Sequence, residues 1–188
     1  SVLYNGMIHP LAPYAMQGII WYQGESNTGR PQEYGTLLKK LTGCWRTLWQ
    51  REDLPFCVVQ LANHMEATDK PQESGWAALR EQQRLTAQSD PHTSLAVAID
   101  LGEASDIHPL RKREVTERCV LALSNAVFGK KNPLSPQPLC AKREAGRIVV
   151  TMDQPLQNCD SLKEFELRGA DGKFHNATAS TNGNKVII

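Results

Sequence analysis

The sequence predicts an α/β protein in which a parallel sheet is flanked by helices in three layers and is followed by a small antiparallel β unit. Three observations support this fold class. Apolar runs of strand length alternate with segments of helical periodicity, and each such run ends in a polar loop. Beyond residue 132 the pattern changes to short strands separated by turn dipeptides. Alternation of this kind is typical of parallel strands buried on both faces.

The first strand is predicted over residues 18–22, an apolar run that ends in turn-forming residues. Pro31 suits the first turn of a helix, and apolar residues then recur at helical spacing up to residue 49. The face so formed contains Tyr34, Leu37, Leu38, Leu41, Trp45, Leu48 and Trp49. Residues 56–61 form a second buried run, so this helix provides the crossover that two parallel strands need.

The second helix is predicted to begin after Ser74, whose hydroxyl suits an N-cap. One side of that helix carries Trp76, Leu79, Gln83 and Leu85. Residues 94–100 form the third buried strand. A third helix follows over about residues 111–128, and Gly129 is a suitable C-cap because glycine adopts the left-handed conformation readily.

The last part of the chain has a different organisation. Three prolines within residues 132–138 predict a linker, and short strands follow at residues 147–152, 164–168 and 185–188. The hairpin signals between them are Asp171-Gly172 and Asn182-Gly183. We therefore expect an α/β domain at residues 1–131. Residues 132–188 are expected to form a linker and a C-terminal β unit, which need not be complete.

Composition excludes several classes of function. The 188 residues contain 21 Lys and Arg against 20 Asp and Glu, and this balance provides no general attraction to nucleic acid. No apolar run approaches the ~20 residues of a transmembrane helix, so we expect no membrane insertion.

The five cysteines are widely spaced, which predicts buried free thiols. No histidines or carboxylates lie at metal-ligand spacing, so no metal site is predicted.

The candidate catalytic and binding residues follow the carboxyl ends of the predicted strands, at one edge of the sheet. The carboxyl ends of parallel strands bind ligands, which places residues 23–28, 63–64 and 100–108 along a single rim. Asp106 precedes His108 by two residues, and such a carboxylate can orient an imidazole and stabilise its protonated form. The pair thus predicts the base half of a hydrolytic triad. The alternative is a solvated loop histidine, because this spacing is common by chance.

A second group of candidates follows the first strand. Gly24 permits close approach of the backbone, and the amides of Gln23 and Asn27 supply donors for a developing oxyanion. The alternative is a capped turn before a helix. Ser26 resembles the serine of a nucleophile elbow, but Thr28 occupies the position at which that elbow needs glycine. Ser26 is therefore not favoured as a nucleophile.

Three segments together resemble the sialate O-acetylesterase family, which belongs to the SGNH/GDSL hydrolases. They are residues 3–11, residues 18–27 and the Asp-Ile-His-Pro sequence at residues 106–109. The Trp-Tyr-Gln-Gly-Glu-Ser-Asn string ending at Asn27 is the most specific of these. The resemblance implies an SGNH-hydrolase-like fold and a serine esterase that removes acetyl groups from sialic acid or related sugars. It further implies no cofactor and a periplasmic, secreted or lysosomal location.

The resemblance also implies roles for individual residues. His108 would be the general base, with Asp106 as the first candidate to orient it. The family usually has Asp-x-x-His, which places Ser105 at the acid position and leaves Asp100, Glu103 or a backbone carbonyl as alternatives. By the same resemblance, the block that supplies oxyanion or substrate contacts would consist of Gln23, Gly24 and Asn27.

One family motif is absent. Family members carry their nucleophile in a Gly-Gln-Ser-Asn type motif on an earlier strand, and these 188 residues contain none. We therefore expect the chain to be the C-terminal portion of a carbohydrate O-acetylesterase, inactive alone, with an N-terminal remainder supplying the serine and an acetylated sugar as substrate. The alternative is a non-catalytic carbohydrate-binding or structural module, with Trp21, Tyr22 and Trp76 as stacking platforms.

Overall fold

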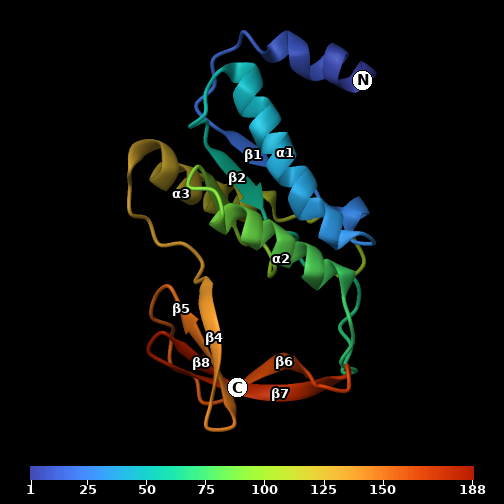
Figure 1. Cartoon of the computed structure of the whole chain (residues 1–188), viewed down its shortest axis with the longest axis vertical. Coiled ribbons are helices and arrows are strands. Elements are labelled where there is room, and N and C mark those ends of the chain that lie inside the picture. The colour runs from blue at the N-terminus through green and yellow to red at the C-terminus, as the bar shows by residue number, and fades with distance from the viewer. The chain divides into compact units, whose positions relative to one another are not determined.

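The computed structural model describes all 188 residues and shows two compact units (Figure 1). The first unit comprises Ser1–Glu66 and Ser74–Leu134, and the second comprises Ala67–Glu73 and Ser135–Ile188. A short segment between the second strand and the second helix thus belongs with the C-terminal β unit. No helix of the chain combines the length and the apolar character that crossing a membrane requires.

A three-stranded parallel sheet forms the centre of the first unit. Its order is β1-β2-β3, with β1 at Ile19–Trp21, β2 at Phe56–Val59 and β3 at Thr93–Ala96. All four residues of β2 are buried because the strand is central and covered on both faces. The predicted parallel sheet is confirmed.

Three helices cover the two faces of this sheet. They are α1 (Pro31–Trp49), α2 (Gly75–Gln88) and α3 (Lys112–Phe128). Val58 of β2 packs in a cluster with α1 and α2 residues such as Leu38 and Leu79, whereas Cys57 packs with residues of α3 such as Val115. Successive side chains of a strand point to opposite faces, so this division produces the three layers that the sequence predicts.

Two predicted helix faces differ in detail, and the first three strands end one to four residues earlier than predicted. Leu37 of α1 is 50% exposed, because the buried face of that helix continues from Leu38 to Thr42. Leu85 of α2 is 40% exposed, because the buried face of α2 continues from Gln83 to Thr86. The third strand ends at Ala96. Beyond it, the Val97 carbonyl accepts a hydrogen bond from Arg118, and a turn closes from Leu101 N–H to the Ala98 carbonyl. These groups are therefore satisfied outside the sheet.

The five cysteines differ in burial, and Cys159 is half-buried. Cys57 on β2 and Cys119 on α3 are buried in the same cluster, whereas Cys44 and Cys140 are exposed, so the prediction of buried thiols is wrong for those two. A hydrogen bond with Cys119, together with burial, raises the pKa of Cys57.

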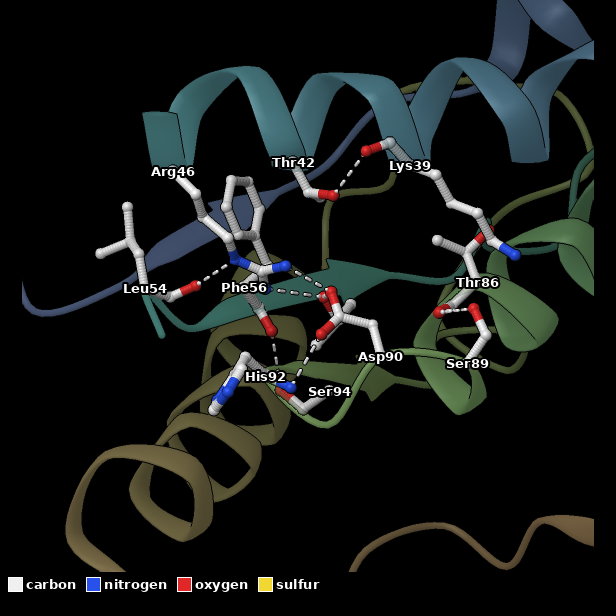
Figure 2. A network of polar contacts seen from close by, with 11 residues as sticks. Lys39, Thr42, Arg46, Leu54, Phe56, Thr86, Ser89, Asp90, His92 and Ser94 are labelled. Carbon is white, nitrogen blue, oxygen red and sulfur yellow. Dashed lines mark hydrogen bonds and ion pairs between the residues drawn. The ribbon is translucent and has the colours of Figure 1, made fainter. Parts of the chain in front are cut away.

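A polar network joins α1 to the start of β3, at the edge of the sheet where the strands begin (Figure 2). The Asp90 carboxylate accepts hydrogen bonds from Arg46 at 2.7 Å, from the Thr93 hydroxyl at 2.6 Å and from the His92 backbone N–H at 3.0 Å. The Arg46 guanidinium also lies over the Phe56 ring, 5.5 Å from its centroid. This network fixes the end of the sheet opposite to the predicted rim.

The second unit contains a five-stranded antiparallel sheet of order β4-β5-β8-β7-β6. The strands are β4 (Pro138–Glu144), β5 (Arg147–Met152), β6 (Leu162–Arg168), β7 (Phe174–Asn182) and β8 (Lys185–Ile187). Strand β4 has no counterpart in the sequence prediction. It pairs with β5 through Ala145 and Gly146, both of which have positive φ. Positive φ at both turn residues gives the backbone the twist that a two-residue β-hairpin needs.

Candidate active site

The loops that follow β2 and β3 are hydrogen-bonded to each other. Asn63 N–H donates to the Ile99 carbonyl at 3.2 Å, and Met65 N–H donates to the Ala104 carbonyl at 3.0 Å. The Gly102 N–H donates to the Asn63 side-chain oxygen at 2.7 Å. A Cβ at Gly102 would overlap the Asn63 carbonyl, so this approach requires glycine. Pairing therefore continues past the ends of the strands and ties the two loops together.

The loop after β1 brings three of the predicted site residues together. Gly24 has φ 152°, a conformation that favours glycine, and precedes the short helical turn Glu25–Asn27. The Gln23 side-chain N–H donates to the Asn27 side-chain oxygen at 2.8 Å, and Asn27 N–H donates to the Gly24 carbonyl at 2.8 Å. Because its oxygen is occupied by Gln23, the Asn27 amide presents its NH₂ group for other acceptors.

Side chains of two helices donate hydrogen bonds to this loop. The Tyr34 hydroxyl of α1 donates to the Gln23 carbonyl at 2.8 Å, and the Gln83 side chain of α2 donates to the same carbonyl at 3.2 Å. Burial raises the pKa of Tyr34. At the start of α2, Gly75 leaves no room for a Cβ because the Thr28 carbonyl occupies that space. Sequence reasoning did not identify Gln83 or Gly75 as site residues; the signal for Gln83 was a polar amide on the apolar face of a helix.

Asp106 and His108 lie close together in the loop before α3. The Asp106 carboxylate accepts a hydrogen bond from the His108 backbone N–H at 2.7 Å, and the same oxygen lies 3.6 Å from His108 Nδ1. The second distance exceeds that of a hydrogen bond, so Asp106 anchors the His108 backbone and lies next to the ring. The His108 side chain is 88% exposed.

The other acid candidates have different environments. Both carboxylate oxygens of Asp100 accept hydrogen bonds from Arg118, at 2.6 and 2.7 Å, and these bonds lower the pKa of Asp100. Ser105, at the acid position of the family spacing, is exposed. Among the candidate carboxylates, Asp106 is the one in ion-pair range of His108.

The aromatic residues near the rim are engaged in packing. Trp76 is 9% exposed, donates its ring N–H to the Ala62 carbonyl at 2.7 Å and lies 5.3 Å from the His64 ring centroid. Tyr22 lies under the Lys112 ammonium, 4.7 Å from its ring centroid. His64 Nδ1 is buried without a partner. Because Trp76 is 9% exposed, its ring has little free face for stacking on a sugar.

Comparisons with known proteins agree on one family. The model of a carbohydrate esterase family, described as sialic acid-specific acetylesterase, matches residues 2–117. The sialate O-acetylesterase of Mus musculus is 32% identical over 187 residues, covering 89% of this chain. The Homo sapiens protein of the same name is 32% identical over 191 residues, covering 93% of this chain. The chain spans 35% of the length of each of these two relatives.

A solved structure extends the similarity to the fold. The crystal structure of a carbohydrate acetylesterase from Xanthomonas citri superposes with a TM-score of 0.90 and is 39% identical in sequence. The match covers 98% of this chain and 44% of that one.

Proposed function

Because the chain belongs to the sialic acid-specific acetylesterase family of carbohydrate esterases, we propose that it carries the general base and the oxyanion loop of such an enzyme. Its substrate would be an O-acetyl group on sialic acid or a related acetylated sugar. The observation that carries this proposal is the placement of two polar groups on loops at the same end of one parallel sheet: Gln23 with Asn27 after β1, and Asp106 with His108 after β3.

In the proposed reaction His108 acts twice. A serine hydroxyl attacks the acetyl carbonyl carbon while His108 takes its proton, and the ester bond to the sugar then breaks as that proton passes to the sugar oxygen. Water hydrolyses the acetyl-serine by the same route and releases acetate. Asp106 would hold the His108 loop through the 2.7 Å backbone hydrogen bond and stabilise the charged ring from 3.6 Å.

The loop after β1 would stabilise the tetrahedral intermediate. Its negatively charged oxygen needs preorganised donors. The free NH₂ of Asn27, the Gly24 backbone N–H and the Gln23 side chain supply donors of this kind. The hydrogen bond between Gln23 and Asn27 keeps the two amides from rotating independently.

We propose that the attacking serine comes from a segment of the complete protein outside these 188 residues. Ser26 is exposed in the turn Glu25–Asn27, and Thr28 stands where a nucleophile elbow has glycine. The relatives are about three times as long as the chain, which leaves ample sequence for the missing group.

Release of acetate from an O-acetylated sialic acid by the complete protein tests the proposal. His108→Ala should lower kcat by about 10³-fold or more, since removing a triad member has effects of this order. His175→Ala is the matched control, because His175 is an exposed histidine of the β unit, and its activity should be unchanged. Sugar binding without acetate release by the unmodified protein would contradict the proposal and favour a carbohydrate-binding module.

The isolated 188-residue chain tests the origin of the serine. We expect no turnover of acetyl esters by this chain. Turnover that Ser26→Ala abolishes would contradict the external serine and identify Ser26 as the nucleophile.

A further inference from the structure

Gln83 is a fully buried amide whose hydrogen bonds join three parts of the molecule. It lies on α2 with 0% of its surface exposed. Its oxygen accepts from Leu61 N–H at 3.0 Å, and its nitrogen donates to the carbonyls of Val59 and Gln23, both at 3.2 Å. Burial of an amide is costly unless its groups are paired, and here both of its donor hydrogens are used.

Two of these bonds complete the end of β2. Strand β2 ends at Val59, and Gln83 satisfies the Val59 carbonyl and the Leu61 N–H just beyond it. The hydrogen bond from Gln83 to the Gln23 carbonyl is not needed to complete the end of β2. The Gln23 carbonyl already accepts a hydrogen bond from the Tyr34 hydroxyl, so the Gln83 bond adds a second donor to it. A carbonyl oxygen with donors from two helices has both lone pairs engaged and a fixed direction.

The direction of this carbonyl determines where the next N–H points. The peptide between Gln23 and Gly24 is planar and trans, so the Gly24 N–H is directed opposite to the Gln23 carbonyl. The carbonyl points at Gln83 and Tyr34 in the interior, and the N–H therefore points away from them. No protein group accepts a hydrogen bond from the Gly24 N–H.

We infer that Gln83 is a positioning residue of the oxyanion loop, which aims the Gly24 N–H at the substrate through the Gln23 carbonyl. The close fit at Gly24 supports this role, because an added Cβ there would lie 2.9 Å from Leu79 Cδ2 and 3.3 Å from Gln83 Nε2. The inference rests on the proposed esterase function and adds to it a residue that never touches the substrate.

The test compares Gln83→Met with Gln60→Met in the complete protein. Gln60 is the matched control, since its side chain also ties the end of β2 to α2, donating to the Arg80 carbonyl at 3.1 Å without contact to the loop. With 4-nitrophenyl acetate, Gln83→Met should lower kcat about 10-fold or more with KM changed by less than about 3-fold, as expected for a misplaced oxyanion donor. Gln60→Met should leave kcat within about 2-fold of the unmodified protein.

Hydrogen exchange supplies a second readout that does not depend on catalysis. Gln83→Met should speed amide exchange in residues 24–28, whereas Gln60→Met should not. Equal kcat values for the two variants, or unchanged exchange in residues 24–28, would overturn the inference. Should Gln83→Met fail to fold, Gln83→Glu is measured by the same criteria, because it keeps an acceptor for the Leu61 N–H and removes the NH₂ group that donates to Gln23 and Val59.

Failure of the inference differs from failure of the proposed function. If His108→Ala leaves hydrolysis unchanged, the proposed site is wrong, and the exchange measurement alone then decides whether Gln83 holds the loop. If His108→Ala abolishes hydrolysis and Gln83→Met does not lower kcat, the site stands and the role of Gln83 is wrong.

Discussion

At the residue scale, the Asp90 network at the start of β3 links stability to pH. Burial raises the pKa of Asp90, but hydrogen bonds from Thr93, Arg46 and the His92 backbone N–H outweigh it, so the pKa lies below its ordinary value. A lowered folded-state pKa means that the network stabilises the fold above the unfolded pKa of about 3.9. This stabilisation is lost as the pH falls through the lower folded-state value.

We predict that Asp90→Asn lowers the free energy of unfolding by about 1.5–3 kcal/mol at pH 6, the value of a hydrogen bond to a charged group. The difference from the unmodified protein should shrink at pH 3, because this lies below the unfolded-state pKa of about 3.9 and the unfolded chain then binds a proton at Asp90. Urea unfolding at both pH values measures it. Asp53→Asn is the control, since Asp53 is 68% exposed in its pair with Arg51 and should contribute little. A difference that grows on acidification would contradict the prediction.

Single residues of the site differ in how far the sequence predicted them. The hydrogen bond between Gln23 and Asn27 follows from one local turn, and so does the contact between Asp106 and His108. These residues are four and two positions apart, so local spacing was informative. Gln83 lies 60 positions from Gln23, and only the folded chain brings the two together.

At the scale of elements, the helix ends and both ends of β5 were predictable, whereas the end of β3 and the start of β4 were not. Pro31 begins α1, Ser74 caps α2 by accepting a hydrogen bond from Ala77 N–H, and Gly129 ends α3 in the left-handed conformation. These signals are local. The end of β3 depends on Arg118, a residue of α3, and strand β4 begins within a proline-rich run that predicts a linker.

The C-terminus of α1 offers a stabilising substitution. Gln50 ends the helix with φ 53° and ψ 39°, a left-handed conformation that costs an L-residue about 1–2 kcal/mol and costs glycine little. We predict that Gln50→Gly raises the free energy of unfolding by about 0.5–1 kcal/mol, after the greater freedom of glycine in the unfolded chain is subtracted. Gln50→Ala keeps the Cβ and should give no such gain. Thermal unfolding of both variants measures this, and a lower Tm for Gln50→Gly would contradict it.

The paired loops after β2 and β3 should be sensitive to a single methyl group. Gly102→Ala would push the Asn63 carbonyl away and shift the loop that carries His108. We predict a loss of about 10-fold or more in kcat in the complete protein, because small misplacements of catalytic groups have effects of this size. Gly29→Ala is the matched control at the same rim, since a Cβ there meets no atom within 4 Å. Equal acetate release by the two variants would contradict the prediction.

At the scale of the whole molecule, the buried apolar residues are unevenly distributed. Of the buried hydrophobic residues, only Ala179 and Val186 belong to the second unit, and the rest lie in the first. Burial of apolar area is the main source of stability. The first unit therefore has a substantial apolar core, whereas the stability of the β unit depends more on the backbone hydrogen bonds between its strands.

We predict that amides of β4–β8 exchange with solvent faster than those of β2, because segments with few buried contacts open at lower free energy. Hydrogen exchange of the complete protein, followed by mass spectrometry at neutral pH, measures both. Slower exchange in β7 and β8 than in β2 would show that the β unit is the more stable part.

The change of pattern after residue 132 was visible in the sequence, but the place of Ala67–Glu73 was not. That segment joins the β unit through contacts with residues about a hundred positions away. Gln72 N–H donates to the Glu166 carboxylate, the Asn176 side chain donates to the Asp69 carbonyl, and Arg168 pairs with Glu73 at 2.9 Å. A local pattern contains no information about such distant partners.

The position of Ala67–Glu73 in the second unit has a consequence for how this part of the protein could be rearranged. The chain passes between the two units after Glu66, after Glu73 and again after Leu134. A gene rearrangement with one breakpoint near Leu134 would transfer the β strands without the stretch that pairs with Glu166, Asn176 and Arg168. Transfer of the β strands alone would therefore lose these three contacts, so residues 67–73 would have to move with the strands for the second unit to remain intact.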